Sequence, residues 1–520
     1  MSTPIHSAAA KAKWNFIAEL PKGLFLASIL LLAWLVIFAM VVRWNALPNM
    51  AELLPGEETE AFWILDKADL KDSGIQLPAE QSTFMGTPLT ELNWINRFGE
   101  AWVDGRDLAF VEVNSKSDAE DFLDSLKAPD ETYKETAVGP SVWSTIYCYS
   151  QSQPYCFTWV GNLLFVGGEE DLLLAIQETA IGVRSSLESE SKYQNVRGRL
   201  AHWNSGFYYI DLQASSSRFL DEFGAASALL ELFPSMGGAL SYQALDGEKA
   251  YLSESFLGVD KTLLGGEAFY HSEAPYPQKI LPWTSEGLAW EWGGQNLYAE
   301  WERMGEILNS ISPASGVVWE AQTNTTLSEW FGEDFDFKTE LAPLLNEEQY
   351  FGFTPGGDFL FIAELETGEA KQVDALKDRL GNNLEFAVTS TNEKGETVAE
   401  LLKPTVELVK RNETLTYEFK VNDEVKLSVV ILNNAVILSN SSELALSTLD
   451  RALGHTESRN LQELEGLLAG SDEVLILHCP LLPDGNILKT LGGGFESILS
   501  TRKLFDDGVF TRTLLHEVQL

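Results

Sequence analysis

The sequence predicts an α+β fold class: a single N-terminal transmembrane helix followed by two tandem repeats of a mixed, largely antiparallel sheet-plus-helix domain. Three observations predict it: a long apolar run near the N-terminus, short alternating strands mixed with single amphipathic helices, and an internal duplication. The chain has 520 residues, 45% of them hydrophobic and 22% charged, so it is long enough to bury a sizeable core.

The apolar run GLFLASILLLAWLVIFAMVV (23–42) carries no charge and has the length of a bilayer-spanning helix. Three lysines precede it and only Arg43 follows before an acidic stretch, so the positive-inside rule keeps the N-terminus in the cytoplasm. The next residues, VVRWNALP, lack a small-x-small cleavage site, which predicts an uncleaved signal anchor. We expect a single-pass protein of the cell membrane with a cytoplasmic tail (1–22), an anchor (23–43) and an extracytoplasmic remainder.

The formal net charge is −41, which predicts a strongly acidic surface. Such a surface repels nucleic-acid backbones and anionic lipid headgroups, so nucleic acid is not an expected partner. The expected partners are the lipid bilayer, through residues 23–43, and an unknown envelope protein or glycan. The acidity also suits cationic partners, divalent metal ions or a saline habitat, but a solvated acidic surface that keeps the protein soluble is the preferred interpretation.

The internal duplication sets the predicted domain boundaries. LPGEETEAFWILDKADL (54–70) aligns with LPWTSEGLAWEWGGQNL (281–297), which matches Trp63 to Trp290, and WVDGRDLAFVEV (102–113) aligns with FTPGGDFLFIAE (353–364). A stretch rich in Gly and Pro lies between the copies. The predicted domains are an extracytoplasmic α+β repeat 1 (44–259), a linker (260–277) and an extracytoplasmic α+β repeat 2 (278–520).

Each copy also contains a clear amphipathic helix. Within SKSDAEDFLDSL (115–126), Ser117 and Glu120 have the spacing of a capping box. Its apolar residues recur with helical spacing, as do those of ETGEAKQVDALKDRL in the second copy. The two stripes are Ala119, Phe122, Leu123 and Leu126, and Ala370, Val373, Leu376 and Leu380.

Two of the three cysteines lie in YCYSQSQPYCF (147–157), which has the pattern strand, turn, strand. With the turn centred on Ser152, Cys148 faces Cys156 across the ladder, and outside the membrane the pair can be oxidised. We expect a disulfide worth ~2–3 kcal/mol. Two thiolates without a nearby histidine make a poor zinc site, and the CxxC redox spacing is absent. Cys479 has the pattern of a buried strand thiol.

A set of apolar and turn motifs resembles a known family. The motifs are an LP-x-x-x-T-x-x-F opening after the membrane helix, an L-F-V-G-G-type strand end and a Ser-Leu…Tyr segment: Leu54, Pro55, Thr59 and Phe62, then Ser186, Leu187 and Tyr193. In this order the chain resembles the bacterial domain-of-unknown-function family 3352, a set of membrane-anchored proteins with no assigned activity. The resemblance covers nearly all of residues 51–520, except that the second copy has ESRNLQEL in place of the Ser-Leu…Tyr segment. It implies a bacterial cell-envelope setting and supplies no functional residues.

No catalytic or cofactor motif is present: the chain has no P-loop, no GxGxxG behind a strand, no GxSxG and no HExxH. Six histidines are scattered without ligand spacing, and a ligand role for His478 beside Cys479 is the weaker interpretation. Two acidic clusters lack the spacing of a calcium loop: Asp66, Asp69 and Asp72, and Glu333, Asp334 and Asp336. We therefore predict no catalytic residue, no cofactor, no metal site and no enzymatic activity.

Six of the fifteen tryptophans fall between residues 283 and 330. Four of them are candidate ligand-binding aromatics, because exposed rings stack on sugars or peptide side chains, but packing in the core is the preferred interpretation. The four are Trp283, Trp290, Trp292 and Trp301. The predicted function is a membrane-anchored, non-catalytic binding or scaffold protein of the cell envelope. The alternatives are a cell-envelope hydrolase with a site between the two repeats, and a periplasmic chaperone or lipid-handling module.

Overall fold

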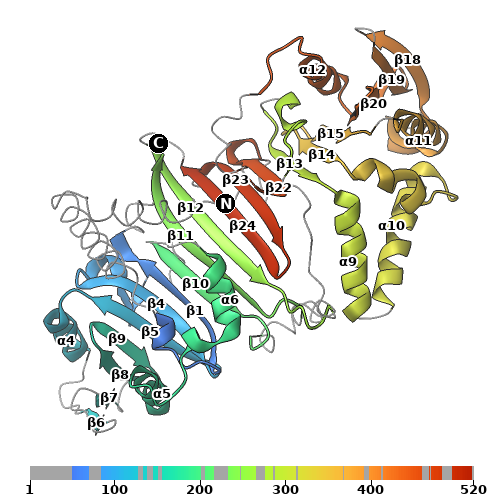
Figure 1. Ribbon diagram of the computed structural model, residues 1–520. Coiled ribbons are helices and arrows are strands. Elements are labelled where there is room, and N and C mark those ends of the chain that lie inside the picture. The colour runs from blue at the N-terminus through green and yellow to red at the C-terminus, as the bar shows by residue number, and fades with distance from the viewer. Residues whose placement is uncertain are drawn as a thin grey trace, which may run out of the picture. The chain divides into compact units, whose positions relative to one another are not determined.

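The computed structural model describes most of the chain that follows residue 49 (Figure 1). The described residues are 50–68, 83–126, 133–137, 145–149, 155–200, 205–215, 232–245, 248–264, 276–284, 287–311, 314–366, 368–391, 397–411, 414–459, 468, 470–482 and 495–517. The predicted anchor, residues 23–43, lies outside them. Within these described ranges, no helix is both long and apolar enough to cross a membrane.

The strands divide into two halves of the sequence. The first half holds β1 (Thr59–Asp66), β2 (Thr83–Phe84), β3 (Thr87–Pro88), β4 (Ile95–Val103), β5 (Arg106–Val113), β6 (Lys134–Ala137), β7 (Thr145–Tyr149), β8 (Tyr155–Val160), β9 (Leu163–Gly167), β10 (Gly206–Asp211), β11 (Ser235–Leu245) and β12 (Glu248–Gly258). The second half holds β13 (Trp290–Gln295), β14 (Glu348–Phe353), β15 (Phe359–Glu364), β16 (Phe386–Thr391), β17 (Thr397–Leu402), β18 (Thr405–Arg411), β19 (Thr414–Val421), β20 (Glu424–Ile431), β21 (Ala435–Ser439), β22 (Glu473–His478), β23 (Phe495–Phe505) and β24 (Gly508–Glu517).

Seven α-helices are placed among the described residues. They are α4 (Lys116–Ser125), α5 (Glu170–Ala180), α6 (Ser191–Arg199), α9 (Leu297–Ile311), α10 (Ser315–Phe331), α11 (Ala370–Asn383) and α12 (Ser442–Ala452). α4 and α11 coincide with the two amphipathic stretches that the sequence identifies. α4 begins earlier than predicted, because Ser115 rather than Ser117 is the N-cap and accepts a hydrogen bond from the Asp118 amide.

Twenty strands form one antiparallel sheet, and the strand connections of its two halves mirror each other about the centre. The order is β18-β19-β20-β21-β15-β14-β13-β22-β23-β24-β12-β11-β10-β1-β4-β5-β9-β8-β7-β6. Read outward from the central pair, each half places its strands in the same sequence of connections. That pair is β12 with β24, which are aligned from Ala250↔His516 to Gly258↔Gly508 (Figure 1).

The predicted fold class, α+β with two tandem sheet-plus-helix repeats, is therefore wrong. The described residues are mostly strand, with few helices, and they share one large antiparallel sheet instead of forming a sheet for each repeat. The physical reason is the pairing of β12 with β24: each would otherwise be a long open edge, and edge strands readily take a partner. Nothing tests the predicted domain boundaries, which stay a prediction.

Helices lie on both faces of the sheet. In the first half, Ala119 and Leu123 of α4 pack against Val111 and Val113 of β5. On the opposite face, Leu108 of β5 lies near leucines of α5, and α6 packs on β10 to β12. The second half is arranged similarly, with α11 on one face and α12 on the other. The face covered by α4 is the one that carries the candidate site.

Candidate ligand-binding site

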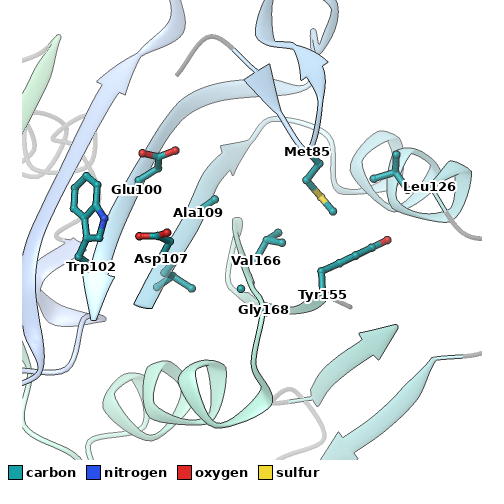
Figure 2. A pocket seen from close by; sticks show the side chains of 11 residues that line it. Met85, Glu100, Trp102, Asp107, Ala109, Leu126, Tyr155, Val166 and Gly168 are labelled. Carbon is teal, nitrogen blue, oxygen red and sulfur yellow. The ribbon is translucent and has the colours of Figure 1, made fainter. Parts of the chain in front are cut away.

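A hollow of about 750 Å³ lies over β4, β5, β8 and β9 on the face that α4 covers (Figure 2). Its wall combines apolar side chains, two aromatic rings, backbone at two glycines and two carboxylates. It is lined by Met85, Glu100, Trp102, Asp107, Leu108, Ala109, Leu126, Tyr155, Val166, Gly167 and Gly168. Figure 2 shows Glu100, Trp102 and Asp107 on one side and Met85, Leu126 and Tyr155 on the other. We call this cavity the hollow.

The β4–β5 hairpin places the polar side of the hollow. Alternate side chains of a strand share a face, so Glu100 and Trp102 of β4 point to the same side, as do Asp107 and Ala109 of β5. Trp102 pairs directly with Asp107, and Glu100 pairs with Ala109. The two carboxylates are therefore diagonal neighbours on adjacent strands, a separation of ~7–8 Å between Cα atoms.

The electrostatics of Glu100 reflect this position. Burial is the main cause that raises its pKa; a hydrogen bond from the Trp63 side chain opposes the shift, and repulsion from Asp107 adds to it. The net result is a pKa above the ordinary carboxyl value. An ionised carboxylate at this place is under-solvated and lies near a second negative charge.

The cations on these strands are engaged elsewhere. Arg97 of β4 lies 3.2 Å from Glu112 and 3.5 Å from Asp66. Arg106 of β5 binds acids at the start of α5, with 2.7 Å between its guanidinium and Asp171. Within the described part of the chain, neither Glu100 nor Asp107 forms an ion pair.

Met85 enters the apolar side of the hollow from the tight turn between β2 and β3. Its φ is 50° and that of the following Gly86 is 79°, so both turn residues are left-handed. Met is a poor residue for this conformation, which glycine and asparagine adopt at much lower cost. A strained backbone is commonly kept where the side chain has a function, and Met is a flexible, polarisable lining residue.

The predicted disulfide is confirmed and lies beside the hollow. Cys148 of β7 pairs directly with Cys156 of β8 in the strand register, with Cα atoms 4.1 Å apart. Tyr155, which lines the hollow, is the neighbour of Cys156. The crosslink therefore fixes the beginning of the strand that carries this ring.

The second half has a similar hairpin with a longer loop: Asp358, which the sequence alignment matches to Asp107, lies in that loop, and Phe359 takes the paired position. On the matching face of β14 and β15, Phe353 pairs with Phe359 and Phe351 pairs with Phe361. These pairs correspond to Trp102–Asp107 and Glu100–Ala109, the two outward-facing pairs nearest the turn. The Phe351 ring lies 4.9 Å from that of Phe353 and 6.3 Å from that of Phe359.

The register also corrects the alignment of Trp63 with Trp290. Trp63 of β1 is paired with Glu100, whereas the position opposite Phe351 is held by Trp292. Trp292, not Trp290, is therefore the counterpart of Trp63. Trp290 pairs with Phe353 instead.

The four predicted ligand-binding tryptophans do not share one surface. Trp283 packs on the core cluster that contains Leu281 and Tyr350. Trp290 contacts Phe351 and Phe353. The remaining two are hydrogen-bonded through their indole N–H groups: Trp292 to Glu473 (3.4 Å) and Trp301 to Thr323 (3.0 Å). Their proposed role in binding stays a prediction.

A second charged group lies on the opposite face of β13. Glu291 is buried, and its carboxylate accepts hydrogen bonds from Tyr350 (2.8 Å) and Arg459 (2.5 Å), with His478 at 3.2 Å. Burial alone would raise the pKa of Glu291, but the His478 and Arg459 contacts outweigh it and lower the pKa. Because every partner of this carboxylate comes from the chain itself, the cluster has the character of a structural ion pair. His478 is thus engaged by a carboxylate, and Cys479 is buried beside it.

Sequence reasoning missed Glu100 and Asp107, which lie in stretches that read as ordinary strands. It also considered two acidic clusters, of which one lies partly outside the described residues. Asp66 pairs with Arg97 and Asp334 with Arg379 (2.8 Å), while Asp69 and Asp72 lie outside the described residues. Among the residues that are described, no group of three or more His, Cys, Asp or Glu side chains could hold a metal ion.

Comparisons with known proteins add little. No family model matches the chain, and no curated protein matches it. A solved structure titled "Structure of crystal form I of TP0453" is similar at 9% sequence identity, covering 42% of this chain and 81% of that one, with a TM-score of 0.24. A likeness at this level carries no argument about fold or function. The site must therefore be interpreted from its own geometry.

Proposed function

We propose that this chain is a membrane-anchored, extracytoplasmic binding protein without catalytic activity, and that it takes an apolar ligand into the hollow. The observation that carries this proposal is the hollow itself: about 750 Å³, lined by Met85, Leu126, Tyr155 and Val166 around a few polar groups. Sites for small ligands have this size and this mixture of an apolar wall with sparse polar groups.

Two further observations support a binding role. The left-handed backbone of Met85 costs conformational energy that glycine or asparagine would avoid. This cost indicates that the methionine side chain itself serves the site. The disulfide between Cys148 and Cys156 holds β8, and with it Tyr155, in place before any ligand arrives. A preformed wall reduces the entropy that binding must lose.

The setting outside the membrane rests on the sequence. The lysines before residues 23–42 and the acidic stretch after them favour export of the remainder. The disulfide supports this orientation, because such bonds persist in oxidising compartments.

The binding site can be tested by filling the hollow in the full-length chain. The probe is Nile red, a neutral dye that fluoresces in apolar surroundings. Ala109→Trp places an indole on the floor of the hollow, and Gly168→Trp places one in its wall, where a Cβ atom would meet nothing within 4 Å. Each variant should weaken dye binding at least tenfold while leaving the far-ultraviolet circular dichroism unchanged.

The matched control is Ala321→Trp, which adds the same ring at an exposed position of α10. Its dye affinity should stay within twofold of the wild type. Wild-type affinity in both hollow variants, or no dye binding by the wild type, would show that the hollow is not the binding site.

A further inference from the structure

We infer that the ligand of the hollow is a small amphiphile, an apolar chain or ring that ends in a protonated amine, whose charge is bound by Glu100 and Asp107. This inference rests on the proposed function, because it assigns a ligand class to the same cavity. Two carboxylates on one side and an apolar wall on the other match such a molecule in both charge and polarity.

The two carboxylates of the hollow are not balanced by a cation of the described residues. Arg97 and Arg106 lie on the same two strands but bind other acids, so the described residues supply no ion pair to Glu100 or Asp107. Glu100 is half-buried, and a carboxylate removed from water is costly unless a cation compensates it. A bound amine would provide that cation.

The hairpin of the sheet does not require acidic residues at positions 100 and 107. At the corresponding positions of the second half, Phe351 and Phe359 occupy the places of Glu100 and Asp107 and pack on each other. Phenylalanine is thus compatible with this hairpin geometry. The carboxylates are specific to the half that contains the hollow, which indicates that they serve the ligand and not the fold.

Two aromatic rings in the wall of the hollow also suit a cationic ligand. Trp102 lies directly across from Asp107, and Tyr155 lies on the far wall. An indole face beside a carboxylate attracts cations through its quadrupole, which adds to the charge interaction. The apolar part of the ligand would extend toward Met85 and Leu126.

The test compares three water-soluble probes of similar shape on the full-length chain in a nonionic detergent: 4-phenylbutylamine, 4-phenylbutanol and 5-phenylpentanoate. Isothermal titration should show that the wild type binds the amine at least tenfold more tightly than the alcohol and the carboxylate most weakly. The double variant Glu100→Gln with Asp107→Asn should bind the amine no more tightly than the alcohol. Its alcohol affinity should stay within twofold of the wild type.

A charge reversal provides a second variant at an exposed site. Asp107→Lys should abolish the amine preference, because the new ammonium group offsets Glu100, so that the amine and the phenylpentanoate bind with similar affinity. Equal binding of amine and alcohol by the wild type, or an amine preference that survives in the double variant, would overturn the inference. Neither result affects the Nile red measurement, so a failure of the ligand class is distinguishable from a failure of the binding site.

Discussion

Met85 is the residue whose backbone conformation is most informative about the site. Several other non-glycine residues with positive φ are Asn or Asp, which tolerate the left-handed region. Methionine lacks the short polar side chain that makes this conformation tolerable. We expect Met85→Asn to raise the free energy of unfolding by about 0.5–1 kcal/mol, because Asn relieves most of the strain. The same variant should bind Nile red several-fold more weakly, because the hollow loses an apolar side chain.

Met85→Leu is the matched control. Leucine keeps an apolar side chain in the hollow but leaves the strain, so dye binding should persist and stability should not rise. Urea unfolding and dye titration measure the two effects. A destabilised Met85→Asn variant would contradict the strain argument.

At the scale of single residues, the sequence predicts an interaction when both partners lie close together in the chain. The Cys148–Cys156 bond follows from one turn between two short strands, because a turn fixes which residues face each other. Glu100 and Asp107 could not be recognised in the same way. Their significance depends on Met85 and Tyr155 reaching the same cavity from other parts of the chain, which no local pattern records.

Among the elements, α9 is joined to the sheet through a cluster of charges. Glu300 in its first turn meets Glu473 of β22 and Arg502 of β23. Arg502 lies 3.3 Å from Glu300 but has its closest contact with Glu473. Burial, followed by repulsion from Glu473, raises the pKa of Glu300 to about 9. Burial beside Glu473 therefore favours the protonated form of the Glu300 carboxyl group in the folded protein.

This arrangement makes stability depend on pH. Since the folded pKa of Glu300 lies above the unfolded one, its contribution is complete below about pH 4.5 and is lost as the pH rises toward 9. Glu300→Gln should remove part of the decline in unfolding free energy over this window, up to about 1.4 kcal/mol per pH unit.

Glu302→Gln, at an exposed position of the same helix, is the control and should leave the pH profile unchanged. Urea unfolding from pH 5 to pH 9 gives the comparison. Parallel profiles for the wild type and Glu300→Gln would show that Glu300 is ionised in the folded state.

The helices and hairpins could largely be predicted from the sequence, because their signals are periodic. The stripes of α4 and α11 are buried as their spacing requires: Ala119 and Leu123 in one, Val373 and Leu376 in the other. The start of α4 was misplaced because its sequence offers serine at both 115 and 117. Either can cap a helix, and only the chain path selects between them.

For the molecule as a whole, the decisive feature is the seam between β12 and β24. Gly508 begins β24 directly opposite Gly258, and a Cβ atom there would lie 2.4 Å from both the Leu257 carbonyl oxygen and the Phe256 ring. We expect Gly508→Ala to lower the free energy of unfolding by about 1–3 kcal/mol, because backbone and ring must both shift.

Gly198→Ala is the matched control. Gly198 lies in α6 with no atom within 4 Å of a Cβ position, so alanine should be neutral or slightly stabilising. Urea midpoints of the two variants measure the difference. Equal midpoints would mean that the seam is not tightly packed at this strand end.

The seam is also where the prediction of fold class failed. Alternation within LSESFL or TRTLLH identifies strands, yet it does not say whether the partner is the next strand or one roughly half the chain away. The alignment of the two copies indicates the duplication, and the two halves have the same strand connections. The two halves join in a single sheet through a long-range pairing, in which the edge strands β12 and β24 form hydrogen bonds with each other.

That union has a consequence for biosynthesis. β12 is synthesised about 250 residues before β24. During synthesis, the backbone amides and carbonyls along one side of β12 therefore lack their hydrogen-bond partners. An unpaired edge of this length is a template for intermolecular association. Shielding of the β12 edge until the β23–β24 hairpin has been made would therefore reduce association between growing chains.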